Sequence, residues 1–226
     1  IAGRTFVVAE SVEGDDLGHA PTMVAHRNGV RCRSVQAAFA VPAIPEPVPV
    51  TLDPARTAVL ALDLTDLLAG TVAACLETIP RVRALLDRAR DAGAAVVFST
   101  GRGPGQAVLP GLAPRPSEPV VSTSADKFHG TELARHLIGR DVAVLCGTNA
   151  NGSILYTAMG ACARGLTVVV ADDGISSKHP FGTALARWQL LHQPGFPNLD
   201  NAPLRPKAVT LSRTDLIAFA PAGDRG

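Results

Sequence analysis

The stretch DVAVLCGTNANGSILYTAMGACARGLTVVVADD, residues 141–173, decides the fold class. Two apolar runs of strand length, Val142–Cys146 and Thr167–Ala171, flank a helical pattern over Asn151–Arg164 that Gly165 closes. Strands that are apolar on both faces are typical of a parallel sheet that helices cover on two sides. The order of strand, helix and strand in this stretch therefore predicts one unit of such a sheet.

The same alternation continues on both sides of this stretch. Pro80 suits the first position of a helix and Gly93 suits its end. The remaining predicted strands are Thr57–Leu62, Ala94–Phe98, Val120–Val121 and Ala208–Leu211, and the remaining predicted helices are Thr131–Ile138 and Phe181–His192. The sequence thus predicts an α/β fold, a three-layer α/β/α sandwich with a mostly parallel sheet.

The first 52 residues differ from the rest of the chain. The segment Val41–Val50 reads VPAIPEPVPV, and its spaced prolines favour an extended, polyproline-like run that cannot continue a helix. We therefore expect residues 1–52 to form an N-terminal extended arm, lying on the main domain or on a partner subunit. Residues 53–226 are expected to form one α/β domain.

Composition excludes several classes of protein. The chain has 226 residues, 21 basic against 20 acidic, and a net charge of +1. A nearly neutral chain lacks the positive charge of a non-specific nucleic-acid binder. Its apolar runs are shorter than the ~18 residues that cross a bilayer. We expect no nucleic-acid partner, no membrane partner and a cytoplasmic location.

Metal and cofactor motifs do not emerge from the spacing of residues. The four cysteines form no CxxC pair, and the six histidines show neither HxxxH nor HExxH spacing. No glycine fingerprint follows the first predicted strand, which disfavours a dinucleotide. We expect neither a metal nor a cofactor.

Three segments should meet at one edge of the sheet, because ligands of open parallel sheets bind beyond the carboxyl ends of the strands. These segments are Asp63 after the first predicted strand, 99–105 after the second and 147–153 after the fourth. Asp63 follows six apolar residues, where a carboxylate is either a general acid or base or ties a loop. Ser153 is either a nucleophile or a helix cap, and Lys127 is either a site cation or a solvated lysine.

Taken in order, Asp63, FHGTEL at 128–133 and GTNANGSILYTA at 147–158 resemble the isochorismatase-like superfamily, also called cysteine hydrolases. The resemblance runs from about Arg56 to Phe219. It implies a three-layer α/β/α domain in a homo-oligomer, a dimer or tetramer. It also implies hydrolysis of an amide-type C–N bond or of the vinyl ether of isochorismate.

The resemblance carries over to single residues only in part. Amidases of this superfamily use an Asp, a Lys and a Cys nucleophile, and Asp63 matches the first of these. The position of the Lys is Ser122 here, and the position of the Cys is Ser153. The chain is therefore expected to be a divergent member that lacks the usual Lys and Cys.

We expect a hydrolase acting on a small polar molecule, with catalytic residues Asp63, Ser153 and Lys127. The expected substrate-binding residues are Ser122, Thr148, Asn149, Asn151 and Gly152. The backbone of residues 148–153 would cradle an oxyanion or carboxylate. The alternative is a catalytically inactive ligand-binding or scaffold protein that keeps the fold and its pocket.

Overall fold

The computed structural model describes residues 42–220, which lie in a compact unit that begins at Pro42. Its strands are β1 Val50–Leu52, β2 Thr57–Leu62, β3 Ala95–Thr100, β4 Val120–Ser122, β5 Val142–Thr148, β6 Thr167–Ser176, β7 Val209–Ser212 and β8 Ile217–Phe219. Its helices are α1 Asp66–Thr71, α2 Ala73–Asp91, α3 Leu133–His136, α4 Leu155–Ala163 and α5 Pro180–Leu191. Within residues 42–220, no helix is long and apolar enough to span a membrane.

Six strands form one sheet in the order β4-β3-β2-β5-β6-β7, and each neighbouring pair is parallel. The chain moves outward from β2 through β3 to β4, and then returns to pair β5 with the other side of β2. The strand order therefore reverses between β2 and β5. Such a reversal is where open α/β sheets bind their ligands.

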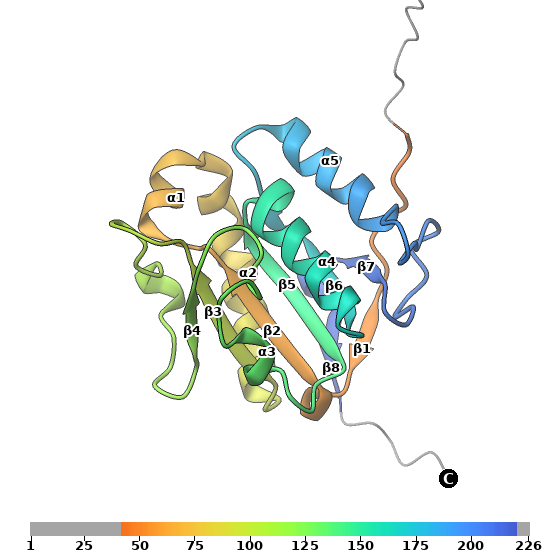
Figure 1. The fold of residues 1–226 in the computed structure, drawn as a ribbon, viewed down its shortest axis with the longest axis horizontal. Helices are drawn as coiled ribbons and strands as arrows, with labels where there is room; N and C mark the ends of the chain where they lie inside the picture. The colour runs from red at the N-terminus through yellow and green to blue at the C-terminus, as the bar shows by residue number, and fades with distance from the viewer. Residues whose placement is uncertain (1–41, 221–226) are drawn as a thin grey trace, which may run out of the picture. The chain divides into compact units, whose positions relative to one another are not determined.

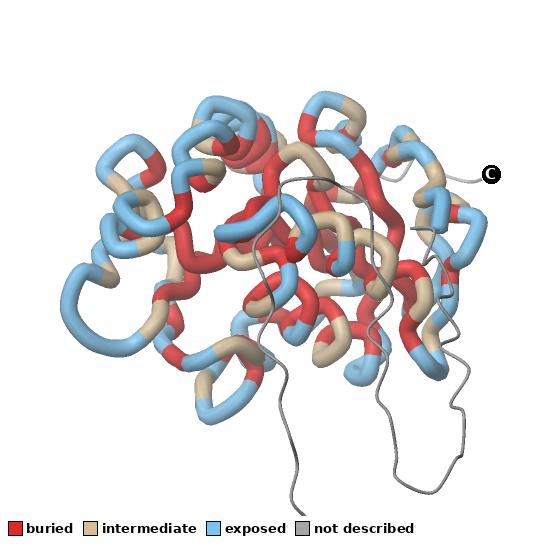
Figure 2. The backbone as a smooth tube through the Cα atoms, turned by 90° about the horizontal axis from the view of Figure 1, so that it is seen from above, coloured by how far each residue is buried: buried red, intermediate tan, exposed pale blue. Residues whose placement is uncertain are grey.

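Helices cover both faces of this sheet, with α3, α4 and α5 on one face and α2 on the other (Figure 1). Alternate residues of β2 face opposite layers: Leu60 and Leu62 belong to the core beside α4 and α5, and Val59 and Ala61 to the core beside α2. Figure 2 shows that buried backbone fills the middle of the molecule. The three-layer α/β/α prediction is confirmed.

Gly147 brings the ends of β2 and β5 together. Its φ is +131°, and a Cβ atom at this position would lie 1.9 Å from the Leu62 carbonyl oxygen. Only glycine fits so close an approach of two backbones. This contact places the residue after β2 beside the turn after β5.

Several element boundaries differ from those that the sequence predicts. Helix α2 begins at Ala73 and contains Pro80, which was expected at its start. The seven residues before Pro80, about two turns, are retained because Cys75 and Thr78 are buried, so packing outweighs the cost of an internal proline. The helix expected over 131–138 shortens to α3, between Gly130 and Gly139, which both have positive φ.

The arm predicted for residues 1–52 is described only from residue 42 onward, and residues 1–41 lie outside the described part of the chain. Its last three residues form β1, which pairs in parallel with β8. Val50 and Leu52 are buried in the core beside α2. These three residues are therefore part of the compact unit.

Candidate active site

Asp63 is the residue that follows β2, at the point where the strand order reverses. Its backbone N–H donates to the carbonyl of Ser99 at 2.9 Å, and its φ is +53°. A positive φ in a residue other than glycine is uncommon, and such residues gather at functional sites. The residue is 6% exposed, so its carboxylate needs partners within the protein.

Three side chains supply those partners. Lys127 Nζ lies 2.8 Å from Asp63 Oδ1, and the Ser153 hydroxyl donates to Oδ2. The Ser99 hydroxyl donates to Oδ1 at 3.4 Å. The structure therefore brings together the three residues predicted as catalytic, and Asp63 lies between the amine and the hydroxyl. We call Asp63, Lys127 and Ser153 the triad.

The pKa of the Asp63 carboxyl is raised above its ordinary value. Burial is the largest cause, because it disfavours the charged form, while Lys127, Ser153 and Ser99 oppose it. A carboxyl with a raised pKa is a better proton acceptor than an exposed aspartate. It is also a proton donor nearer to neutral pH.

Lys127 is 1% exposed, which shows that the solvated-lysine interpretation was wrong. It lies in the loop between β4 and α3, and this loop crosses the carboxyl edge of the sheet. Ser122, the position that the resemblance assigns to the lysine, is exposed, and its hydroxyl donates to the Gly101 carbonyl. The chain thus supplies a buried amine five residues further along, and Ser122 does not join the triad.

The turn between β5 and α4 holds Ser153 in place. Gly152 has non-helical angles inside the short helical turn Ala150–Ile154, so the regular helix begins only at Leu155. The Asn149 carbonyl accepts the N–H groups of Gly152 and Ile154 at 3.0 and 3.2 Å. The predicted helix over 151–164 therefore starts as an irregular turn that carries the hydroxyl.

Two serines at the end of β6 anchor this turn, and the sequence analysis missed both. The Ser176 hydroxyl lies 2.6 Å from the fully buried Thr148 hydroxyl. The Ser177 hydroxyl donates to Asn151 Oδ1 at 2.9 Å and accepts the Asn151 N–H at 3.5 Å. Their signal in the sequence is the pair of serines soon after an apolar strand, which was predicted to end at Ala171.

A groove of about 660 Å³ adjoins the turn, because Ser176 and Ser177 line it. The first turns of α2 and α5 form its walls. Its charged lining residues are of both signs: Arg81, Lys178, Arg187, Glu77 and Asp173. None of Asp63, Lys127 and Ser153 lines this groove, so it is a neighbour of the triad and not its own cavity.

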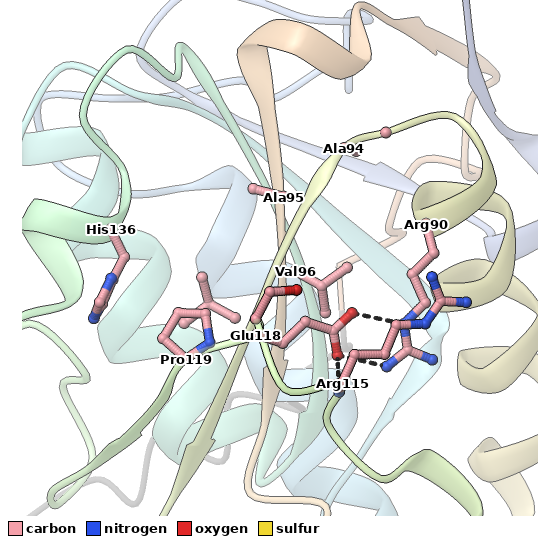
Figure 3. A pocket seen from close by; sticks show the side chains of 11 residues that line it. Arg90, Ala94, Ala95, Val96, Arg115, Glu118, Pro119 and His136 are labelled. Atoms are coloured by element: carbon pink, nitrogen blue, oxygen red, sulfur yellow. Dashed lines mark hydrogen bonds and ion pairs between the residues drawn. The ribbon is translucent and has the colours of Figure 1, made fainter.

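A second cavity, of about 370 Å³, lies at the amino end of β3 (Figure 3). The triad lies beyond the carboxyl ends of the strands, so this cavity is at the opposite edge of the sheet. Arg90 binds Glu118 there with two contacts of 2.8 and 2.7 Å. Burial favours a higher pKa for Glu118, but hydrogen bonds from Arg90 and from the Arg115 N–H outweigh it and lower the pKa. This pair ties the segment before β4 to α2.

The triad consists of one carboxylate, one amine and one hydroxyl. A lysine ammonium is a poor metal ligand, because it carries a proton and a positive charge. In the described part of the chain, no three His, Cys, Asp or Glu side chains gather so as to hold a metal ion. The geometry of the triad is instead that of proton transfer between a hydroxyl and a carboxylate.

The sheet and its triad define an α/β protein with a buried acid–amine–hydroxyl centre at the strand-order reversal. A sequence model of the isochorismatase domain matches residues 57–196, and the chain belongs to this family. No curated protein sequence matches the chain.

Solved structures share the fold at low sequence identity. A cysteine hydrolase from Pseudomonas syringae pv. phaseolicola 1448A has a TM-score of 0.61 and 19% identity, covering 77% of this chain and 94% of its own. N-carbamoylsarcosine amidase from Thermoplasma acidophilum has a TM-score of 0.59 and 17% identity, covering 71% and 97%. A ribonuclease from Caenorhabditis elegans has a TM-score of 0.62 and 21% identity, covering 74% and 81%. These likenesses concern the fold alone, since one fold hosts several chemistries.

Proposed function

We propose that the protein hydrolyses an amide-type C–N bond of a small polar molecule, with Ser153 as nucleophile and Asp63 as general base and acid. The observation that carries the proposal is the hydrogen bond from the Ser153 hydroxyl to Asp63, whose other oxygen contacts Lys127. A hydroxyl is a weak nucleophile and needs an adjacent base. Family membership and the fold shared with N-carbamoylsarcosine amidase support a hydrolase.

The reaction has two halves in this proposal. Ser153 Oγ bonds to the carbonyl carbon and its proton passes to Asp63; the C–N bond then breaks, and the amine leaves with that proton. Water next attacks the acyl ester and gives a proton to Asp63, which returns it to Ser153 Oγ as the acid is released. Lys127 would stabilise the ionised carboxylate between these transfers, because its amine contacts Asp63 Oδ1.

The turn before α4 would stabilise the charge that develops on the carbonyl oxygen. Backbone N–H groups at the beginning of a helix favour an oxyanion. The N–H groups of Gly152 and Ile154 already donate to the Asn149 carbonyl, so we assign this role to the N–H of Ser153 itself. Thr148, Asn149, Asn151 and Gly152 shape this turn, and the adjoining groove offers volume for the rest of the substrate.

The proposal is tested with a serine-directed fluorophosphonate and a panel of primary carboxamides, ureido compounds and vinyl ethers. We expect a covalent adduct that peptide mass spectrometry locates on Ser153, together with amide turnover. Ser153→Ala should lose both, while Ser117→Ala, an exposed serine at the opposite edge, should keep both. Absence of adduct and turnover in the wild type would favour the alternative, a catalytically silent ligand-binding or scaffold protein.

A second candidate function is supported by the raised pKa of Asp63. A protonated Asp63 would donate its proton to the carbon of a vinyl ether. Water would then add to the resulting cation and return a proton to Asp63, and the C–O bond would break to give a ketone and an alcohol. This route does not use Ser153 as a nucleophile, so Ser153→Ala would retain it.

The pH dependence of kcat/KM separates these two chemistries. Amide hydrolysis needs ionised Asp63, so activity should fall as the pH drops through the raised pKa of this carboxyl. Lys127→Met should move this acid limb to higher pH, because the cation lowers the pKa of Asp63. Protonation of a vinyl ether needs the acid form, so its activity would rise over the same interval as the pH falls.

A further inference from the structure

Lys127 belongs to a loop without regular secondary structure, although its side chain is buried. A catalytic amine needs a fixed position, because a misplacement of about 1 Å costs about 10²-fold in rate. The loop must therefore be held in place by contacts with a rigid element. Helix α4 provides them.

Thr157 of α4 makes two of these contacts. It is fully buried, and its hydroxyl accepts the Lys127 backbone N–H at 3.2 Å and donates to the Ala125 carbonyl at 3.4 Å. A threonine inside a helix often bonds the carbonyl four residues earlier in its own helix. Here the hydroxyl bonds the loop instead, on both sides of Asp126.

Further contacts fix the two ends of the lysine. The Lys127 carbonyl accepts the Thr131 hydroxyl at 2.5 Å, and Nζ donates to the Thr123 carbonyl at 3.3 Å. The loop also lies directly on Gly160, where a Cβ atom would lie 3.0 Å from the Phe128 ring and 3.1 Å from the Asp126 carboxylate. The loop is thus docked on α4 through one hydroxyl and one glycine.

Thr157 and Gly160 of α4 are three residues apart, a spacing that places them on one face of the helix, and Ser153 lies in the irregular turn that leads directly into α4. The segment that presents the Ser153 hydroxyl to Asp63 therefore also carries the group that binds the lysine loop. We propose that Thr157 is a positioning residue that fixes Lys127 against Asp63 and Ser153. This inference deepens the proposed function, because it concerns the same triad.

The test follows the Asp63 carboxyl directly by its carbon chemical shift in an NMR pH titration. Lys127 lowers the pKa of Asp63. Thr157→Val keeps the shape but removes the hydroxyl, so it should raise the pKa in the same direction as Lys127→Met. Thr157→Ser should restore the wild-type titration. With an amide substrate from the panel, Thr157→Val should also lower kcat by about tenfold to a hundredfold.

Thr210→Val is the matched control for the loss of a buried hydroxyl. Thr210 is also fully buried, accepts one backbone N–H and donates to one carbonyl, both at 3.1 Å, but it lies in β7. The Thr210→Val variant should be less stable than the wild type, but the pKa of Asp63 should stay unchanged. An Asp63 titration that is unchanged in Thr157→Val would overturn the inference.

Gly160→Ala provides a second perturbation of the same docking, with the Thr157 hydroxyl intact. Its added Cβ should push Phe128 and Asp126 away and so raise the pKa of Asp63. This variant therefore tests the docking even if Thr157→Val fails to fold. If Thr157→Val does not fold, an unchanged Asp63 titration in Gly160→Ala would overturn the inference in its place. The titration needs no substrate. A lack of turnover in the wild type would therefore contradict the proposed function, while the titration would still show whether Thr157 positions Lys127.

Discussion

Asp63→Asn should lower turnover of the amide substrate by about a thousandfold or more, the scale of loss when a member of a catalytic unit is removed. A neutral amide can neither accept the proton of Ser153 nor form an ion pair with Lys127. The asparagine oxygen can still accept a hydrogen bond, but the proton transfer from Ser153 and the ion pair with Lys127 are lost. Initial rates with the best substrate of the panel measure this loss.

The same substitution should also destabilise the fold, because it leaves the Lys127 ammonium buried without its counter-charge. Breaking one side of a buried ion pair costs about 3–5 kcal/mol of the free energy of unfolding. Urea denaturation measures this cost. Combining Asp63→Asn with Lys127→Met should recover part of the stability, since the unpaired charge is gone, but none of the turnover.

Glu118→Gln is the control for the loss of an ion pair. The Arg90–Glu118 pair is similarly shielded, with side chains 9% and 8% exposed, but it lies at the opposite edge of the sheet (Figure 3). This variant should lose stability and keep its turnover. If folded Asp63→Asn kept its turnover within about tenfold of the wild type, Asp63 would not be the proton acceptor that general base catalysis requires.

The three layers and the parallel sheet follow from local patterns that the sequence states clearly, whereas the order of the strands came from the structure. Apolar runs such as Val142–Cys146 can only be buried on both faces, and this requirement leads to a parallel sheet between helices. Helix boundaries were harder to predict. Proline strongly prefers the first turn of a helix, but the burial of Cys75 stabilises about two further turns before Pro80.

The site was predictable where it depends on strand ends. Asp63 and Ser153 follow strands that the sequence marks clearly, so their convergence could be expected. Lys127 could not be placed in this way, because a loop with no periodicity carries it, and a surface lysine is the ordinary expectation. Its contacts with Thr157 and Thr131 decide its position, and these are long-range or local side-chain bonds that no pattern encodes.

Ser153→Cys should introduce a thiol that iodoacetamide alkylates at neutral pH at least about a hundredfold faster than the buried Cys146 and Cys162. An ordinary thiol of pKa about 8.5 is a few per cent thiolate at pH 7. Burial raises the pKa of Cys146 and of Cys162 to about 12, which leaves roughly one thiolate in 10⁵ at pH 7. The charge of Lys127 lowers the pKa of the introduced thiol and that of Asp63 raises it, so the two effects oppose each other.

Peptide mapping separates position 153 from the four natural cysteines, so the alkylation rate can be assigned to one sulfur. Ser212→Cys is the matched control, because Ser212 is fully buried in β7 and would give a thiol closed to the reagent. Rapid alkylation at position 153 alone would show that a small molecule reaches the side chain beside Asp63. Equal, slow alkylation rates at positions 153 and 212 would show that small molecules do not reach the side chain at position 153. Ser153 could then not attack a carbonyl carbon, and of the two proposed reactions only proton donation by Asp63 to a vinyl ether would remain.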